Sequence, residues 1–297
     1  MITFYEEKIG FPKEASDFFE ESYKKIASVS GAEEALRSAM NTYFECETTE
    51  EVESILAKVS EESGVHRYTV DMIFLLTGLE ELCRRYLAKG YSEELFIDTM
   101  RDLTYKLREC RDVYGIWGTS VFFWYHRFFK MDLFSQGRLQ FHHRPFPQEK
   151  YKDILKTGDN VFACHIPSSG PLHYEDVMES LKRAYKFYAD ELVDGVLRVH
   201  CSSWLLYPPH AEHLFPEGSN LKRFYDLFDV FESKQDPQNK DFFRVFGKIY
   251  SEDILKDLEE DNTLKRNLKK YLLDGNCMGS GVGIILFDGE RIISLDK

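Results

Sequence analysis

Apolar residues in the first half of the chain recur at helical spacing. Segments 49–64 and 92–110 repeat apolar residues three and four positions apart, and Ser92 stands where an N-cap residue belongs. The segment 70–90 between them is apolar on nearly every side as far as Leu79 and is followed by turn chemistry at Gly90. This pattern predicts a helical bundle whose central helix spans 70–90.

The second half changes to short apolar runs separated by turn residues. Strands are expected at 138–144, 160–166, 196–206, 241–250 and 281–288. Helical stripes lie between them, and eight of the nine prolines fall from Pro145 onward. The sequence therefore predicts an α+β chain, with an all-helical N-terminal domain at 1–130 and a mixed α/β domain at 131–297.

Composition narrows the classes of partner. A net charge of -13 repels nucleic acid and anionic membranes on average. The N-terminus shows no basic segment followed by an apolar one, and no run of about 18 apolar residues occurs. The six cysteines include no CxxC pair, which argues against a zinc ribbon or a disulfide framework. We expect a cytoplasmic protein that binds neither nucleic acid nor membranes.

One stretch joins a strand to a helix through a polar turn: VFACHIPSSGPLHYEDVMESLKRAYKFY, at 161–188. Backbone N–H groups and the helix dipole make such a turn suitable for holding a phosphate. Pro167 and Pro171 contribute no donors, however, and Glu175 and Asp176 would repel an anion. An ordinary strand-to-helix turn is therefore the alternative.

A second polar constellation lies in VLRVHCSSWLL. If this segment is extended, alternation places four functional side chains on one side: Arg198, His200, Ser202 and Trp204. That face is unusually polar for a strand inside a sheet, which a binding cleft would explain. His165 with Ser168, or His200 with Ser202, could form a base and hydroxyl pair. A hydrogen-bonded structural histidine is the alternative for each.

Several familiar motifs are missing. No GxSxG elbow or Walker motif occurs, and GSGVG at 279–283 precedes a strand where a dinucleotide fingerprint would follow one. His142 and His143 are adjacent and face opposite ways on a strand, while His210 and His213 lack a third ligand in register. No metal site is predicted.

Four segments together resemble a bacterial family of acyltransferase domain-containing proteins. They are LFSQGRLQFHHR, ACHIPSSGPL, HCSSWLLYPPHAEHLFPEGSNLKRFYDLFDV and FFRVFG, and the resemblance spans most of residues 115–250 with matching order and spacing. In that family a helical N-acyltransferase-type domain precedes a C-terminal domain with a GNAT-like fold. The resemblance implies transfer of an acyl group, with acetyl expected, from acyl-CoA as cosubstrate to an amine on a small molecule or protein.

Site roles follow from combining this chemistry with strand alternation. His200 is the candidate base, and Cys201 or Tyr207 the candidate acid for the leaving thiolate. The turn residues Ser168, Ser169 and Gly170 would lie near the coenzyme A pyrophosphate. The substrate-binding candidates are His165, Arg198, Ser202 and Trp204.

The chain departs from the GNAT superfamily at the pyrophosphate loop. The usual Q/R-x-x-G-x-G/A pattern is missing, and IPSSGPL occupies the comparable strand-to-helix turn without its glycines. A non-catalytic GNAT-like protein that binds a ligand or partner is therefore the alternative function. Acyl transfer through a serine or cysteine intermediate is a further rival, and no oligomeric state is predicted.

Overall fold

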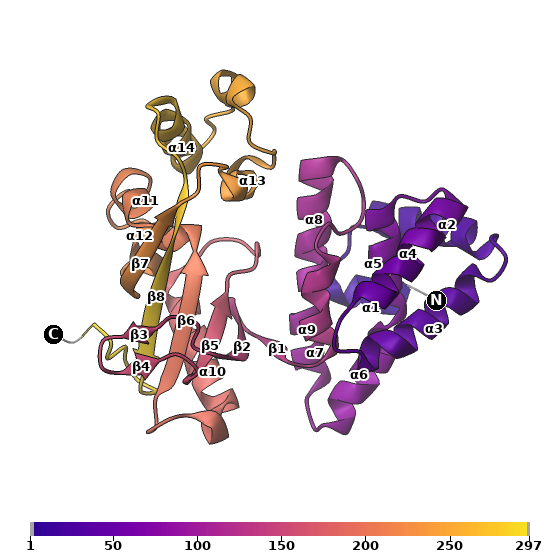
Figure 1. Ribbon diagram of the computed structural model, residues 1–297, viewed down its shortest axis with the longest axis horizontal. Helices are drawn as coiled ribbons and strands as arrows, with labels where there is room; N and C mark the ends of the chain where they lie inside the picture. Colours follow the sequence, from indigo (N-terminus) through magenta and orange to yellow (C-terminus); the bar gives the residue numbers. More distant parts are fainter. Residues whose placement is uncertain (1–2, 296–297) are drawn as a thin grey trace. The chain divides into compact units, whose positions relative to one another are not determined.

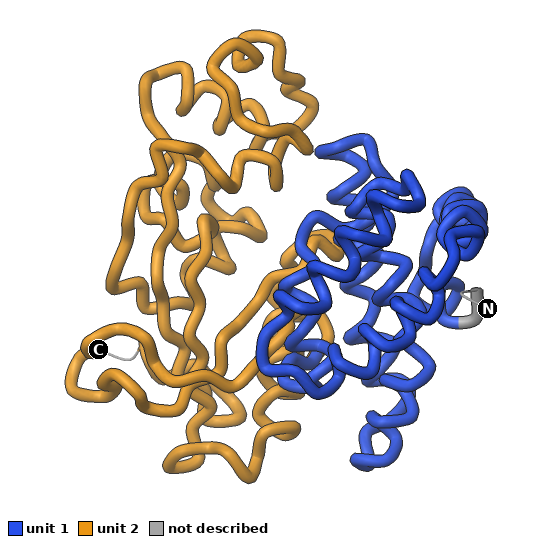
Figure 2. Tube along the Cα trace, turned by 45° about the vertical axis from the view of Figure 1, so that its right-hand side comes forward, with its two compact units in different colours: residues 1–134 blue, residues 135–297 orange. Residues whose placement is uncertain are grey.

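The computed structural model describes residues 3–295. It divides the chain into two compact units, residues 1–134 and residues 135–297, which Figure 2 draws in different colours. Each unit has its own buried core, and we describe each by itself.

The first unit is built from helices (Figure 1). Its α-helices are α1 (Thr3–Ile9), α2 (Lys13–Ala27), α3 (Ala32–Glu45), α4 (Glu50–Ser63), α5 (Arg67–Thr77), α6 (Leu79–Ala88), α7 (Glu93–Met100), α8 (Asp102–Tyr114) and α9 (His126–Phe129). A 3-10 helix, η1 (Phe122–Tyr125), precedes α9. α4 ends at Gly64 in the left-handed conformation, and the Ser92 side chain accepts a hydrogen bond from the Leu95 amide at the start of α7, as the sequence predicts.

The predicted central helix 70–90 is two helices, α5 and α6, which meet at Gly78. A Cβ atom at Gly78 would lie 2.7 Å from the Met40 sulfur and 2.7 Å from the Phe129 ring. The glycine therefore lets α3 and α9 side chains approach the backbone between the two helices. The prediction of one continuous helix was wrong because apolar periodicity does not register this close packing.

The predicted helix 92–110 is also divided, at Arg101, into α7 and α8. The second helix begins at Asp102, a carboxylate that is only 1% exposed. The Tyr125 hydroxyl donates a hydrogen bond to Asp102 Oδ2 at 3.0 Å, which gives this buried carboxyl group a polar partner. A tertiary partner that sequence periodicity does not reveal therefore accompanies the break.

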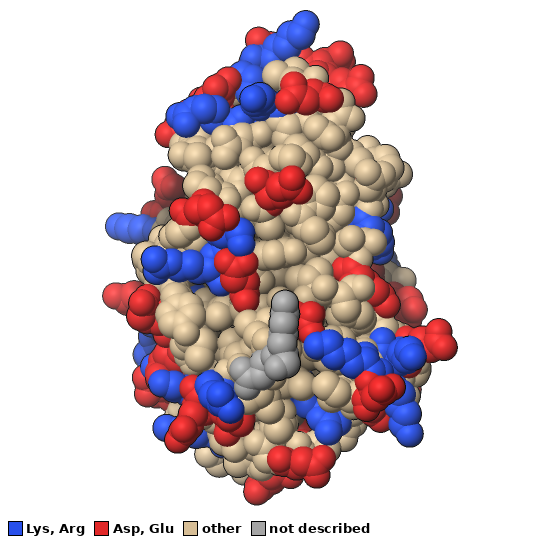
Figure 3. All heavy atoms as spheres, turned by 90° about the vertical axis from the view of Figure 1, so that its left-hand side faces the viewer, with Lys and Arg blue, Asp and Glu red and all other residues tan. Residues whose placement is uncertain are grey.

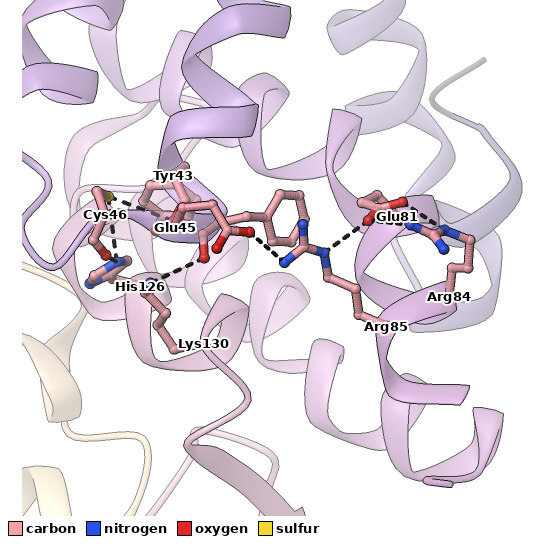
Figure 4. A network of polar contacts seen from close by, with 9 residues as sticks. Tyr43, Glu45, Cys46, Glu81, Arg84, Arg85, His126 and Lys130 are labelled. Carbon is pink, nitrogen blue, oxygen red and sulfur yellow. Dashed lines mark hydrogen bonds and ion pairs between the residues drawn. The ribbon is translucent and has the colours of Figure 1, made fainter. Parts of the chain in front are cut away.

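Polar side chains tie the C-terminal end of α3 to α6 and α9 (Figure 4). Lys130 Nζ donates to the Phe44 carbonyl at 3.1 Å, and His126 Nε2 lies 3.1 Å from the Cys46 carbonyl. The Arg85 guanidinium lies over the Phe44 ring and pairs with Glu45 at 3.0 Å. Lys130 and His126 thus contact carbonyls that a helix end leaves without intrahelical partners, whereas Arg85 pairs with a side-chain carboxylate.

The second unit contains a six-stranded mixed sheet in the order β1-β2-β5-β6-β8-β7 and a separate β3–β4 hairpin. The strands are β1 (Leu133–Gln136), β2 (Leu139–Pro145), β3 (Lys150–Tyr151), β4 (Leu155–Lys156), β5 (Asn160–His165), β6 (Leu197–Ser203), β7 (Asp229–Gln235) and β8 (Gly279–Phe287). β5 and β6 run parallel, whereas β2 with β5, β6 with β8 and β7 with β8 run antiparallel.

The helices of this unit connect or flank the strands (Figure 1). They are α10 (Tyr174–Phe187), α11 (Pro208–His213), α12 (Asn220–Tyr225), α13 (Phe243–Phe246) and α14 (Thr263–Leu273). The 3-10 helices are η2 (Ala189–Glu191), η3 (Trp204–Leu206), η4 (Lys240–Phe242) and η5 (Glu252–Asp257). α10 is the crossover between the parallel strands β5 and β6, as the predicted strand, turn and helix at 161–188 require.

Different elements cover the two faces of the sheet. On one face, Phe162 of β5 packs against Tyr188 at the end of α10, with ring centroids 4.3 Å apart. On the other face, Val161 joins the buried residues Phe146 and Tyr151 of the hairpin region in one apolar cluster. Further along this face, His165 at the end of β5 is half-buried and Ser202 of β6 is exposed.

The observed strands differ from the predicted ones at 241–250, which is not a strand, and at β1, β3, β4 and β7, which were not predicted. Residues 241–250 hold η4 and α13 in place of a strand, because Phe242 and Phe246 stack at helical i, i+4 spacing and Gly247 ends the turn at φ 62°. β7 was not predicted. It is the exposed edge strand, and a bulge between Val230 and Glu232 breaks the alternation that would have revealed it.

Figure 3 shows one face of the chain, on which acidic and basic side chains are intermixed around an uncharged area. Across residues 3–295, no helix combines the length and the hydrophobicity that a membrane crossing requires.

Candidate active site

Polar residues gather on the hairpin-side face of the sheet, across β2, β5 and β6. The register aligns His142 with Ala163, and Ala163 with His200, so these three form one row. Two residues further along the parallel strands come His165 and Ser202, which alternation places on the same face. The structure thus brings together three residues that the sequence predicted for the site: His165, His200 and Ser202.

His165 stands at the open end of this face. It is the last residue of β5 and is half-buried, and Ser202 on β6 is exposed. His165 Nε2 lies 2.8 Å from Nδ1 of His142, which is 4% exposed. A histidine at the edge of the sheet is therefore held by a second histidine beneath it.

His200 lies deeper in the same face. Its ring meets Phe146 edge-on at 5.9 Å, and its Nε2 lies 3.1 Å from Gln148 Oε1. Burial, with a smaller contribution from the Arg144 charge, lowers the pKa of His200 to about 4. His200 is therefore neutral at pH 7 and is a weak proton acceptor there.

Arg198 extends the polar face on β6. Its side chain is 16% exposed and its guanidinium lies 3.7 Å from Asp194. Alternation places it beside His200, as the sequence predicts. A cation at this position could attract an anionic group of a substrate.

Cys201 and Tyr207 lie on the opposite face. Alternation turns Cys201 away from His200, and it is 1% exposed. A hydrogen bond with Cys201 and burial raise the pKa of Cys164, the neighbouring thiol, well above its usual range. A Cβ atom built on Gly279 of β8 would lie 2.7 Å from the Tyr207 ring. By alternation, Gly279 shares this face of β8 with Gly281 and Gly283. The structure therefore does not bring Cys201 or Tyr207 together with His200.

Trp204 is also separate from the polar face. β6 ends at Ser203, and Trp204 starts η3. The centroid of its ring lies 5.9 Å from that of His210 and 6.2 Å from that of Phe215. The prediction that Trp204 continues the strand beside Ser202 was wrong. The Ser203 hydroxyl accepts a hydrogen bond from the Leu205 amide, which turns the chain out of the sheet.

The turn after β5 is clamped by one arginine. The Arg138 guanidinium donates hydrogen bonds to the carbonyls of Pro167 at 2.9 Å, Gly170 at 2.7 Å and Pro171 at 2.9 Å. The turn residues Ser168, Ser169 and Gly170 are exposed, and within the described chain their amides donate to no other residue. Gly170 has φ 115°, a conformation that favours glycine.

This turn offers amide donors to an anion, while Glu175 and Asp176 in the first turn of α10 oppose its binding. With the carbonyls of the turn committed to Arg138, the exposed amides remain available as donors, and α10 begins at Tyr174 just beyond. Backbone amides near the start of a helix are a usual means of holding a phosphate group. The proposed roles of Ser168, Ser169 and Gly170 therefore depend on their backbone amides. The turn conformation and Arg138, which holds it, matter more than the side chains of these three residues.

Sequence reasoning did not assign roles to His142, Arg138 or Gln148. The first was considered only as a metal ligand beside His143, which alternation correctly places on the other face. The contacts of all three depend on the register of β2 with β5 and on the loop that leads to the hairpin. Among residues 3–295, no group of three or more His, Cys, Asp or Glu side chains is placed to hold a metal ion.

Comparison with known families matches both parts of the chain. Residues 4–131 match the model of the N-acyltransferase N-terminal domain, and residues 133–285 match the model of the GNAT-like C-terminal domain. The α+β class, with a helical first part followed by a GNAT-like mixed sheet, is thereby confirmed. A comparison with curated proteins found no match.

Solved structures of acyltransferases share the fold. One, in complex with decanoyl-CoA and teicoplanin, has a TM-score of 0.71 at 19% identity and covers 95% of this chain and 86% of its own. Another, in complex with CoA and 10C-teicoplanin, has a TM-score of 0.67 at 20% identity, with coverage of 92% and 88%. A third, with decanoyl-CoA, has a TM-score of 0.65 at 19% identity, with coverage of 95% and 98%.

Because the C-terminal model alone spans more than half of the chain, the assignment does not depend on these distant structures. The chain belongs to the family that joins an N-acyltransferase N-terminal domain to a GNAT-like C-terminal domain.

Proposed function

We propose that this protein transfers an acyl group from acyl-CoA to an amine. The observation that carries the proposal is the polar face at the end of the parallel strands β5 and β6, next to a turn with unoccupied amide donors. GNAT-type chemistry needs a pyrophosphate site and a proton acceptor close together, and this region of the second unit offers candidates for both.

In the proposed reaction, the turn binds coenzyme A and an imidazole accepts the proton. The amides of Ser168, Ser169 and Gly170 would bind the pyrophosphate of coenzyme A, with Arg138 holding the turn in place. His165 is a better candidate than His200 for the base, because it is half-buried beside Ser202 whereas burial leaves His200 weakly basic. Arg198 and Ser202 would contact the substrates.

The reaction that fits this arrangement is direct transfer. The amine nitrogen attacks the thioester carbon, the C–N bond forms as the C–S bond breaks, and the proton of the attacking nitrogen passes to His165. Coenzyme A leaves as a thiolate and takes up a proton from solvent. No covalent bond between acyl group and protein is needed, which agrees with Cys201 lying on the other face.

The length of the acyl chain and the class of the acceptor amine are the two substrate features to vary in an assay. Acetyl was the expectation from sequence, whereas two solved acyltransferases with this fold are in complex with decanoyl-CoA, one of them also with teicoplanin. The donors to compare therefore run from acetyl-CoA to decanoyl-CoA. A small-molecule amine, such as an amino sugar, is the first class of acceptor to examine.

A coupled assay tests the proposal. Release of free coenzyme A thiol is measured for the donor series against amino sugars, polyamines and a lysine peptide, and the acylated product is identified by mass. We expect amine-dependent release that falls at least 100-fold in His165→Ala, since removing a general base costs about 10² to 10⁴ in rate. Full activity in that folded variant would exclude His165 as the base.

The rival route through a covalent intermediate has its own readout. If Cys46, Cys277 or a serine carried the acyl group, the intact mass of the protein would rise by one acyl unit after mixing with donor alone. Direct transfer predicts an unchanged mass.

A non-catalytic ligand-binding protein is the second candidate, because the glycine-rich pyrophosphate pattern of the superfamily is missing. Donor binding without amine-dependent thiol release, for every acceptor class in the assay, would favour that function.

A further inference from the structure

The contact between His142 and His165 is a hydrogen bond in the plane of both rings. The rings are nearly parallel, at 7°, and their centroids are 4.9 Å apart. One pair of ring nitrogens is nevertheless only 2.8 Å apart. Parallel rings that were stacked face to face would not bring two atoms so close, so the rings lie side by side and meet at their edges.

An N–H···N bond of this kind holds one proton between two nitrogens. One imidazole must donate and the other must accept, because two protonated nitrogens at 2.8 Å would repel each other. The pair therefore fixes the tautomers of both rings together.

Their surroundings decide which ring accepts. His142 is 4% exposed, and burial disfavours a charged imidazole. His165 is half-buried at the end of its strand, where solvent and substrate are closer. A neutral His142 that accepts from His165 Nε2 would stabilise the charge that His165 acquires when it takes up a proton.

We propose that His142 is the positioning residue of this site: its Nδ1 accepts the hydrogen bond from His165 Nε2–H, which orients the His165 ring and favours its protonated form. The role resembles that of the carboxylate behind a catalytic histidine, with a buried neutral imidazole in its place. The structural part stands without the proposed reaction, and the kinetic part rests on it.

Strand alternation and register place further polar groups on the face of this pair. β2 contributes Gln140 and Arg144, β6 contributes Arg198, His200 and Ser202, and the loop before the hairpin contributes Gln148. The two arginines disfavour a further positive charge, which makes an acceptor behind His165 more important. Asp194 pairs with Arg198 at 3.7 Å and offsets part of its charge.

Two variants of His142 distinguish the loss of the acceptor atom from the loss of the imidazole ring. His142→Asn keeps an oxygen close to the position of Nδ1, whereas His142→Ala removes the acceptor. His143→Ala is the matched control, because His143 is the next residue of β2 but is exposed on the other face.

Long-range ¹H–¹⁵N spectra of the imidazoles test the structural part without substrate. We expect His165 in the Nε2–H tautomer in wild type, His142→Asn and His143→Ala, and a mixture of tautomers in His142→Ala. The titration midpoint of His165 should fall by about one pH unit in His142→Ala, the size expected for one lost hydrogen bond to a charged group. An Nδ1–H tautomer in wild type, or a His165 spectrum that His142→Ala leaves unchanged, would overturn the assignment.

Kinetics test the functional part. We expect kcat to fall about 10- to 100-fold in His142→Ala, as for other residues that orient a reacting group, with KM for acyl-CoA unchanged. His142→Asn should recover most of this loss, and the acidic limb of the pH profile should move with the His165 midpoint. Equal losses in the Asn and Ala variants would contradict the role. If wild type releases no thiol with any donor, the proposed function fails, while the spectra still decide the hydrogen bond.

Discussion

At the scale of single residues, the structure explains the glycines of GSGVG in β8, which the sequence analysis could only exclude as a dinucleotide-binding motif. GSGVG is not a nucleotide fingerprint; it is the strand surface on which the segment after β6 rests. A Cβ at Gly281 would lie 1.8 Å from the Leu206 carbonyl oxygen and 2.5 Å from the Leu206 carbonyl carbon. Because these are backbone atoms, they cannot rotate away, and only glycine fits.

Gly281→Ala should therefore displace η3 from β8. We expect a loss of unfolding free energy of at least about 1–3 kcal/mol, as for other overpacked sites, measured by urea denaturation. Ser280→Ala, whose side chain points to the other face of the same strand, should change stability by less than about 0.5 kcal/mol. Equal stability of the two variants would show that the approach of Leu206 is not a constraint.

At the scale of elements, the positions of β2, β5, β6 and β8 could be predicted from the sequence, whereas their neighbours in the sheet could not. The strand, turn and helix at 161–188 could be predicted because an apolar run, a Pro and Gly turn and an amphipathic stripe follow one another. β7 could not, because its charged edge and its bulge hide the period of two. The face shared by His142, His165 and His200 depends on register, which one sequence does not specify when both sides of a strand are buried.

The same burial makes the sheet sensitive to acid. The pKa of His200 is about 4 when folded and about 6.5 when unfolded. The unfolded chain therefore binds more protons between these values, and stability should fall as pH drops from about 6.5 to 4, by at most about 3 kcal/mol from this residue.

His200→Gln, which cannot titrate, should flatten the pH dependence of stability. Urea unfolding at pH 7 and pH 4.5 measures the change, and His210 should retain its own contribution, since burial also lowers its pKa to about 4. His143→Gln, at an exposed position, is the control. An identical slope in wild type and His200→Gln would mean that His200 is not neutral in the folded protein.

At the scale of the whole molecule, the two compact units match two family models, and the candidate site lies in the second. The composition predicted a folded acidic chain, and periodicity predicted helices followed by a mixed sheet. Neither could predict the site itself. Arg138 reaches the turn 29 to 33 residues later through backbone carbonyls, a contact that leaves no pattern in the sequence.

The net charge of -13 works against the binding of anions on average. Coenzyme A is a polyanion, so the proposed binding of acyl-CoA requires local donors that offset the average charge. In this account those donors are the turn amides, and they are in place only while Arg138 holds the carbonyls.

Calorimetric titration of acetyl-CoA and decanoyl-CoA into wild type, Arg138→Ala and Arg183→Ala tests this claim most directly. Arg183 is the control because it is an exposed arginine of α10 that pairs with Glu179 of its own helix. We predict binding of at least one donor by wild type and Arg183→Ala, and a dissociation constant at least roughly tenfold higher in Arg138→Ala, since one charged hydrogen bond is worth about 1.5–3 kcal/mol. No binding of either donor by wild type, or equal affinity in all three proteins, would contradict it.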